Sequence, residues 1–154
     1  MVTRKKSSKR SVEKERRYEM VYVTRRLTFS ASHRLFNPAL SEADNQRIFD
    51  KCSNEHGHGH NYVLEVTVAG EPNPETGYVI DLKKLKAIMM REIIENVDHK
   101  NLNHDVEFLR GVIPTAENIA KAIWRILEPH IIEGKLHSVR LHETENNVVE
   151  VLGD

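Results

Sequence analysis

Three histidines that alternate with glycines make Cys52–Tyr62 (CSNEHGHGHNY) the most informative segment of the 154-residue chain. In extended backbone, residues i and i+2 project to the same face about 7 Å apart, so two of these imidazoles can converge on one ion. The glycines let the backbone bend to bring them together. Neutral imidazole suits Zn²⁺, and a catalytic zinc site has three protein ligands and one open position. The segment therefore predicts a metal site; a polar surface loop or a nonspecific metal-binding tract is the alternative.

His33 is the candidate for the third ligand. It ends a predicted strand through Phe29-Ser-Ala-Ser-His33, and we expect this strand to pair with the strand that follows His60. Such pairing would bring imidazoles from both strands to one place. A lone histidine is more often solvated or satisfied by one hydrogen bond, so the assignment of His33 depends on the neighbouring cluster.

Strands must position these histidines, and β-branched and aromatic residues indicate where the strands lie. A turn with two prolines and a glycine, EPNPETG over residues 71–77, separates the second strand from the third. The predicted strands span residues 20–32, 61–69, 78–80, 135–143 and 147–151.

Three helices are predicted from their caps and from the spacing of apolar residues. Ser41 begins a short helix that runs to about residue 49. Asp81 begins a second helix, in which apolar residues recur every three or four positions and which fades near Val97. Thr115 caps a third helix, which ends before Pro129. This order of elements predicts an α+β fold, an antiparallel β-sheet with two helices packed on one face.

The composition is that of an ordinary globular domain, with 39% hydrophobic and 30% charged residues. No apolar run approaches the roughly 18–20 residues that a membrane span needs, and the N-terminus is too charged for a secretory signal. Cys52 is the sole cysteine, which excludes an internal disulfide and favours a reducing compartment. We therefore expect a cytoplasmic protein that does not bind membranes.

The charge of the chain is unevenly distributed. Residues 1–17 carry eight of the 23 basic side chains but only two of the 23 acidic ones, so the remainder is acidic. We expect residues 1–18 to be a disordered basic tail and residues 19–154 to be the folded domain. The tail could be a nuclear-import-like patch, a weak nucleic-acid contact, a phosphorylation site at its serines or a passive segment. The acidic body argues against nucleic acid as the main partner.

Five motifs occur in the order found in 6-pyruvoyltetrahydropterin synthases, a family that the chain resembles from about residue 20 to residue 151. The motifs are Phe29-Ser-Ala-Ser-His33-Arg-Leu, Gly57-His58-Gly-His60-Asn-Tyr62, Asp98-His99-Lys-Asn-Leu102, Thr115-Ala-Glu-Asn118 and His142-Glu143-Thr144. Because several motifs stand in register, the resemblance is specific. It implies a tunnelling fold and a lyase of tetrahydrobiopterin biosynthesis with a Zn²⁺ cofactor.

Two overlapping histidine pairs could hold the metal. In bacterial relatives that make 6-carboxytetrahydropterin, a cysteine shortly precedes the pair, and the spacing of Cys52 and His56 superficially matches that pattern. The family's Gly-Glu turn, however, falls ten residues after the second metal histidine, and Gly70 lies ten residues after His60. The resemblance therefore leaves His56 in a loop. The implied zinc ligands are His33, His58 and His60.

The resemblance also implies a substrate, 7,8-dihydroneopterin triphosphate, and a base that removes protons from its side chain. Cys52 would be that base, and because a free thiol is mostly protonated at neutral pH it needs activation. Asp98 would orient His99, and His99 would activate the thiol. Without the resemblance, Asp98-His99 reads more simply as a helix end followed by a turn, and Cys52 as a small buried side chain.

Glu143 would anchor the pterin by accepting hydrogen bonds from its ring donors, as a carboxylate does from a guanidinium. Thr115 and Glu117 are expected to line the same pocket. The family usually has a second threonine where this chain has Ala116, so a hydroxyl contact at that position is lost.

Members of the family assemble as homohexamers, two stacked trimers whose sheets form a barrel with active sites between subunits, and the resemblance implies the same here. Three rival functions stay open. They are the 6-carboxytetrahydropterin synthase reaction on the same substrate, a zinc-stabilised scaffold without catalysis, and a zinc hydrolase that uses metal-bound water.

Overall fold

A computed structural model of the chain describes residues 20–154, so the predicted basic tail of residues 1–18 lies outside the described residues. Five strands form one sheet in the order β3-β1-β2-β4-β5. The strands are β1 (Val21–His33), β2 (His58–Gly70), β3 (Lys100–Asn101), β4 (Lys135–His142) and β5 (Val148–Leu152). Together with its helices, this sheet makes an α+β fold, as the order of elements predicts.

The two long strands β1 and β2 pair antiparallel over their whole length, from Val21 opposite Gly70 to His33 opposite His58. Alternate residues of both strands face the same side, so that Phe29 lies opposite Tyr62 and the two rings stack with centroids 4.8 Å apart. This face is buried, whereas the residues between point to the opposite, more exposed face. The predicted pairing of these two strands is confirmed.

The sheet is mixed, which corrects the prediction of a purely antiparallel one. The short strand β3 lies on the outer edge of β1 and pairs with it in parallel, Lys100 beside Ala31 and Asn101 beside Ser32. β2 returns the chain to the start of β1, and the helical segment of residues 82–97 then carries it along β1 to β3, so β3 runs in the same direction as β1. Two residues are too few to leave a periodic signal, so residue patterns do not reveal β3.

Residues 78–80 do not form the predicted third strand. Val79 and Ile80 are buried, but they contribute to the core from a bend that leads into Asp81. Both edges of β2 are already occupied, one by β1 and the other by β4, so no edge of this strand is free to pair with them.

The predicted helices are present, and each begins at its predicted cap. The side chains of Ser41, Asp81 and Thr115 accept hydrogen bonds from the backbone amides of the first turns of α2, α3 and α5. The helix that begins at Asp81 continues through a π-helical turn, η2, to α4. The helical bounds are α2 (Glu42–Phe49), α3 (Leu82–Met89), η2 (Met90–Ile94), α4 (Glu95–Val97) and α5 (Ala116–Leu127), with 3₁₀ turns η1 (Asp50–Ser53), η3 (Glu107–Leu109) and η4 (Glu128–His130).

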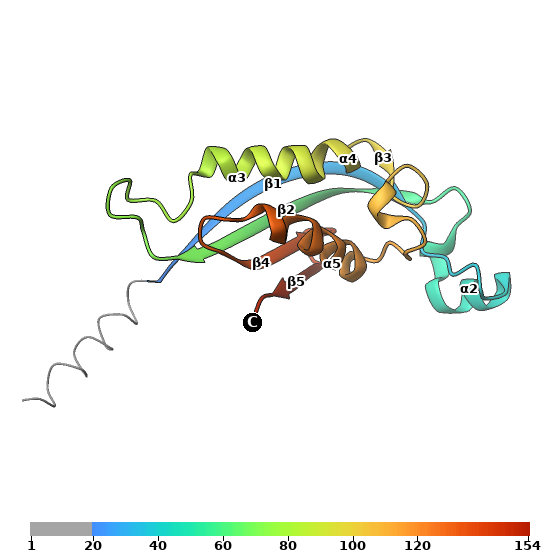
Figure 1. The fold of residues 1–154 in the computed structure, drawn as a ribbon. Helices are drawn as coiled ribbons and strands as arrows, with labels where there is room; N and C mark the ends of the chain where they lie inside the picture. The colour runs from blue at the N-terminus through green and yellow to red at the C-terminus, as the bar shows by residue number, and fades with distance from the viewer. Residues whose placement is uncertain (1–19) are drawn as a thin grey trace, which may run out of the picture.

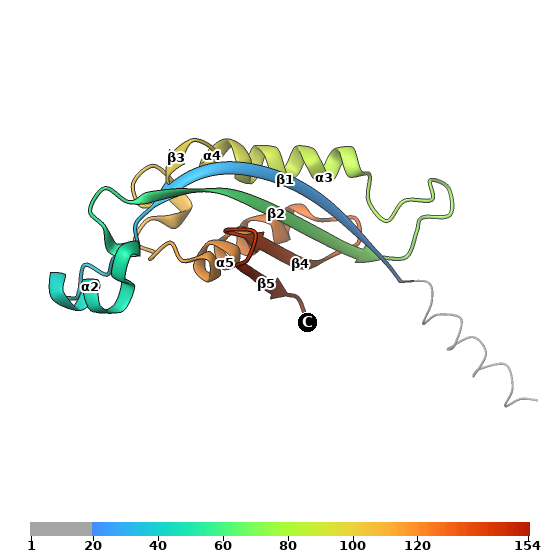
Figure 2. The ribbon, with the colours of Figure 1, turned by 180° about the vertical axis from the view of Figure 1, so that it is seen from behind.

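One hydrophobic core lies between the sheet and the helices α3 and α5 (Figure 1). Leu85 and Met89 of α3 and Ile119, Ile123 and Leu127 of α5 are fully buried in this core, where α3 packs against β1 and α5 against β4 and β5. The short helix α2 instead stands at one end of the molecule, which the view from behind also shows (Figure 2). Two helices therefore cover one sheet face, as predicted, and α2 is a third, peripheral helix.

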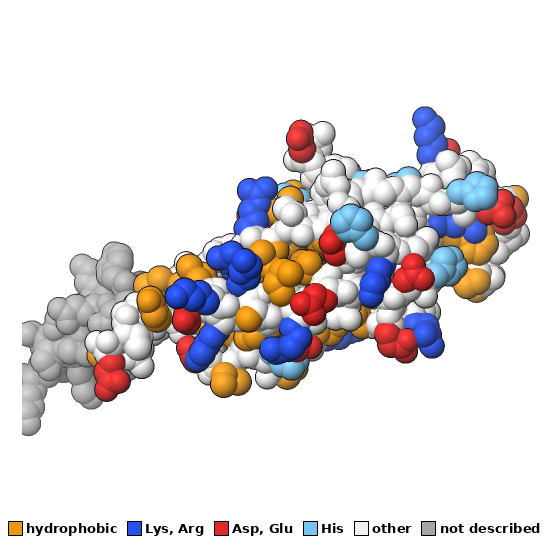
Figure 3. All heavy atoms as spheres, turned by 90° about the horizontal axis from the view of Figure 1, so that it is seen from above, with side chains coloured by type: hydrophobic (Ala, Val, Ile, Leu, Met, Phe, Trp, Pro, Cys, Tyr) orange, Lys and Arg blue, Asp and Glu red, His pale blue; other side chains and the backbone are white. Residues whose placement is uncertain are grey.

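The described surface carries charges of both signs. From above, Lys and Arg side chains are interspersed with Asp and Glu, and hydrophobic side chains lie between them (Figure 3). None of the helices formed by residues 20–154 has the length and apolar character that crossing a bilayer requires.

Candidate metal centre

Three histidines converge at the end of the β1–β2 pair. His33 lies directly opposite His58 in the strand register, and His60 lies opposite Ala31, so all three side chains project from the buried face. The Nε2 atom of His33 is 3.1 Å from Nε2 of His58 and 3.1 Å from Nε2 of His60. Three nitrogen ligands of one tetrahedral ion at about 2.0–2.1 Å lie roughly 3.3 Å apart. The trio therefore has the spacing of a metal-binding group.

The buried member of the trio is oriented by the loop before α5. His33 is 1% exposed, and its Nδ1 lies 2.8 Å from the carbonyl oxygen of Pro114. A carbonyl can only accept, so Nδ1 carries the proton and Nε2 is left with its lone pair facing the other imidazoles. Burial lowers the pKa of His33 to about 4 and outweighs the opposing effect of this hydrogen bond. The ring is thus kept neutral, the form that binds a metal.

Two further side chains border the trio. A carboxylate oxygen of Glu143, which directly follows β4, lies 3.9 Å from Nε2 of His33. The hydroxyl of Tyr62 lies 3.4 Å from Nδ1 of His33, and burial together with the nearby Glu143 charge raises the tyrosine pKa. Burial lowers the pKa of His60, although the Glu143 charge opposes this effect. The structure thus places Glu143 beside the histidines, on the side of β4.

Cys52 lies in the turn η1, between α2 and β2, and its side chain is half-buried. Its carbonyl oxygen accepts a hydrogen bond of 2.8 Å from the amide of Leu35, two residues beyond His33. The backbone of the predicted base is therefore attached to the same end of β1 as the buried metal-ligand candidate.

Asp98 and His99 lie on the outer edge of β1. One Asp98 oxygen accepts from the Ser30 amide at 2.9 Å, and the other lies 2.9 Å from Nδ1 of His99. These hydrogen bonds, the Ser30 amide first, lower the pKa of Asp98. His99 adopts a positive φ of 58° and its side chain is 82% exposed. Within residues 20–154 no hydrogen bond joins His99 to Cys52, so the structure forms the dyad but does not connect it to the thiol.

The start of α5 holds the remaining predicted residues. Thr115 caps this helix, with its Oγ1 accepting from the Asn118 amide at 3.3 Å. It directly follows Pro114, the hydrogen-bond partner of His33, so its backbone lies near the metal centre. Glu117 lies in the first turn of the helix and is exposed.

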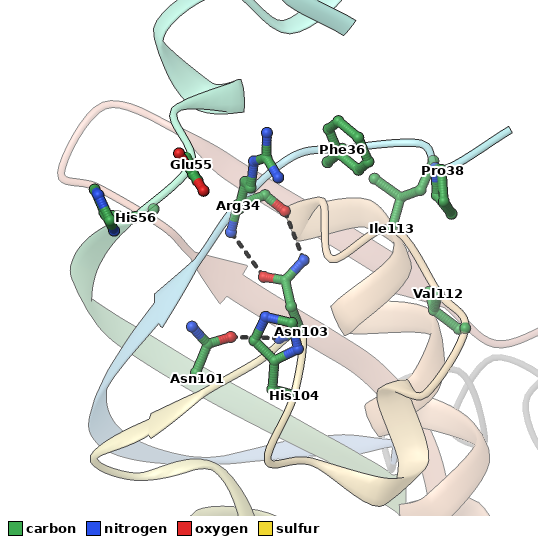
Figure 4. A pocket seen from close by; sticks show the side chains of 12 residues that line it. Arg34, Phe36, Pro38, Glu55, His56, Asn101, Asn103, His104, Val112 and Ile113 are labelled. Carbon is green, nitrogen blue, oxygen red and sulfur yellow. Dashed lines mark hydrogen bonds between the residues drawn. The ribbon is translucent and has the colours of Figure 1, made fainter. Parts of the chain in front are cut away.

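His56 is separate from the trio. It is exposed and lines a different cavity of about 250 Å³, together with Arg34, Asn103 and His104 (Figure 4). The metal-binding group of the described residues contains His58 and His60 instead. This agrees with the choice of register that places His56 in a loop.

Two residues of the site escaped the sequence reasoning. The Pro114 carbonyl is a backbone group, and no residue pattern predicts which backbone carbonyl accepts a hydrogen bond from a histidine. Tyr62 could have been found, because it stands two residues after His60 in the same strand and must therefore share its face.

The fold and the site define an α+β protein with three histidines at one end of a long antiparallel strand pair. These histidines could hold a metal ion. Residues 22–154 match the family model described as 6-pyruvoyl tetrahydropterin synthase. The chain belongs to this family.

Similar proteins and a solved structure support this family assignment. The chain is 48% identical over 132 residues to the 6-pyruvoyl tetrahydrobiopterin synthase of Pongo abelii and 46% identical over 132 residues to that of Homo sapiens, which in both cases is 86% of this chain and 91% of the relative. The structure of Caenorhabditis elegans 6-pyruvoyl tetrahydropterin synthase superposes with a TM-score of 0.83 at 40% identity, covering 88% of this chain and 96% of that one.

Proposed function

We propose that this chain is a zinc-dependent lyase that converts 7,8-dihydroneopterin triphosphate to 6-pyruvoyltetrahydropterin and triphosphate, a step of tetrahydrobiopterin biosynthesis. The observation that carries the proposal is the convergence of three Nε2 atoms within a member of this family. Three neutral imidazoles fit Zn²⁺ and leave a position for substrate. When bound, the ion supplies Lewis-acid polarisation of the side-chain hydroxyls of the substrate.

Glu143 binds and orients the pterin in this proposal. Its carboxylate oxygen lies 3.9 Å from Nε2 of His33, so a ring held there by hydrogen bonds lies beside the histidines. A carboxylate that accepts two hydrogen bonds fixes both the position and the angle of a planar ring. Thr115 and Glu117 complete the pocket from the first turn of α5, with Thr115 next to the carbonyl that orients His33.

Cys52 removes protons from the substrate side chain, and the Asp98–His99 dyad activates its thiol. Asp98 holds the Nδ1 side of His99 and thereby sets which ring nitrogen can accept a proton. The ring of His99 is 82% exposed and so is accessible to a neighbouring chain, which fits a homohexamer in which active sites lie between subunits. In that assembly one subunit would present its dyad to the thiol of another.

The reaction needs no external oxidant. Triphosphate leaves as the side chain becomes a diketone, and the two electrons lost by the side chain reduce the pterin ring. We further propose that residues 19–154 form the catalytic domain and that the protein is cytoplasmic.

The test is incubation of the purified protein with 7,8-dihydroneopterin triphosphate, with and without Zn²⁺, followed by identification of the products by mass spectrometry. We expect triphosphate and 6-pyruvoyltetrahydropterin only when zinc is present. Release of acetaldehyde would instead indicate the 6-carboxytetrahydropterin reaction. Stepwise loss of phosphate with an intact side chain would indicate a hydrolase, and either result would overturn the proposal.

A further inference from the structure

The side chain of Asn103 forms a reciprocal pair of hydrogen bonds with the backbone of Arg34, which is 69 positions away in the sequence (Figure 4). The Arg34 amide donates to Oδ1 at 2.7 Å, and Nδ2 donates to the Arg34 carbonyl oxygen at 2.8 Å. A primary amide has the same donor and acceptor as a peptide group, so Asn103 pairs with Arg34 as a strand residue would.

This pair continues the sheet beyond the point where the main-chain ladder ends. Lys100 and Asn101 pair with β1, and the Leu102 amide donates to the Ser32 carbonyl oxygen at 2.8 Å. The chain then turns away, with the Asn103 amide donating to the Asn101 side chain at 2.9 Å. The Asn103 side chain therefore supplies the next rung on that edge of the strand.

The clamped residue stands between two groups of the proposed active site. Arg34 directly follows His33, the buried member of the metal centre, and directly precedes Leu35, whose amide binds the Cys52 carbonyl oxygen. From the other side Gly57 approaches so closely that a Cβ at this position would be 2.7 Å from the His33 carbonyl oxygen. The backbone of His33 and Arg34 is thus restrained on one side by close contact with Gly57 and on the other by the hydrogen bonds of Asn103.

We propose that Asn103 is a positioning residue for the metal centre: by fixing the backbone of Arg34 it holds His33 and the Cys52 turn in register with His58 and His60. The proposal rests on the proposed role of His33 as a metal ligand. Without the clamp, Arg34, the residue after β1, loses its partner on one edge, and His33 beside it must be ordered when the metal binds. Metal affinity should then fall even where the fold persists.

Asn103→Leu tests this, because leucine has a similar volume but no hydrogen-bonding group. Asn103→Asp keeps the acceptor for the Arg34 amide. Asn73→Leu is the matched control, since the Asn73 side chain also accepts from backbone amides, those of Glu75 and Thr76, in a loop outside the metal centre. For each full-length variant, Zn²⁺ affinity is measured by chelator competition, the visible spectrum is recorded with Co²⁺ bound, and thermal unfolding is followed in parallel.

We expect Asn103→Leu to weaken Zn²⁺ binding by about 10- to 100-fold, as loss of an outer support of a metal site does, and to alter the Co²⁺ spectrum. Asn103→Asp should recover only part of the affinity, because it keeps the acceptor for the Arg34 amide but has no donor for the Arg34 carbonyl oxygen, and Asn73→Leu should keep the wild-type affinity and spectrum even if it unfolds earlier. Should Asn103→Leu not fold, Asn103→Ser replaces it.

Wild-type affinity and spectrum in the Asn103→Leu protein, with only the unfolding temperature lowered, would overturn the positioning role and leave the proposed function standing. Wild-type protein that binds zinc but yields no triphosphate would overturn the proposed function and leave the positioning role standing. If the wild-type chain binds no zinc, both are wrong.

Discussion

The Nδ1 atom of His33 donates a hydrogen bond to the carbonyl oxygen of Pro114, 81 residues away, at a distance of 2.8 Å. This contact joins the end of β1 to the residue before the cap of α5. It fixes the tautomer of the buried imidazole and directs its Nε2 at His58 and His60. The start of α5 and the metal centre are therefore one structural unit.

The metal-free protein should lose stability as the pH falls from about 6.5 to about 4. In the unfolded chain an ordinary histidine takes up a proton near pH 6.5, whereas burial keeps His33 neutral until about pH 4. The unfolded state binds more protons in this window, so the contribution is complete above pH 6.5 and is lost as the pH falls towards 4. Its size is on the order of 3 kcal/mol. Urea unfolding in the presence of a chelator measures it.

The control for this pH dependence is His33→Asn, which removes the titrating ring. The free energy of unfolding of this variant should change less between pH 6.5 and pH 4 than that of the wild type. An equally steep dependence in both proteins would show that other groups cause it.

The choice between overlapping histidine pairs can be tested by metal content. His58→Ala removes one of three converging ligands, so zinc should be lost on dialysis. His56→Ala is the matched control, because this exposed histidine has the same neighbouring glycine but lines another cavity. It should retain about one zinc per chain by elemental analysis. The reverse result would mean that the metal binds in the other register.

Cys52→Ala should lower kcat for triphosphate release by about 10²- to 10⁴-fold, the usual loss when a positioned base is removed. Its zinc content should not change, because the metal-binding group of the described residues contains only histidines. Unchanged triphosphate release would contradict the assignment of the thiol as base. A loss of zinc would instead indicate that the sulfur belongs to the metal centre.

Gly57→Ala should destabilise the protein more than Gly77→Ala. Both glycines have a positive φ, 70° and 75°, so both substitutions carry backbone strain of about 1–2 kcal/mol. Only at Gly57 does the added Cβ meet another group, the His33 carbonyl oxygen at 2.7 Å, whereas at Gly77 nothing lies within 4 Å. The difference in the free energy of unfolding, measured by urea titration, isolates this contact. If both variants lose the same free energy of unfolding, the end of β1 can move away from the added Cβ at no energetic cost.

Features that depend on neighbouring residues could be predicted from the sequence. Helix caps are local, because a side chain at Ser41, Asp81 or Thr115 reaches an amide two or three residues ahead. The projection of His58 and His60 to one face follows from the two-residue period of a strand. The apolar run at residues 78–80 misled the strand prediction, because Val79 and Ile80 are buried in a bend, and apolar character alone does not distinguish a paired strand from such a bend.

The sequence by itself determined the ligand types, their spacing along β2, and the elements that carry them, since each of these depends on a few adjacent residues. Only the tertiary structure decided that β3 runs parallel to β1, that the Pro114 carbonyl orients His33, and that Asn103 pairs with Arg34. These contacts join residues 69 or more positions apart. These pairings depend on how the helices and strands pack against one another, so no local pattern of residue types predicts them.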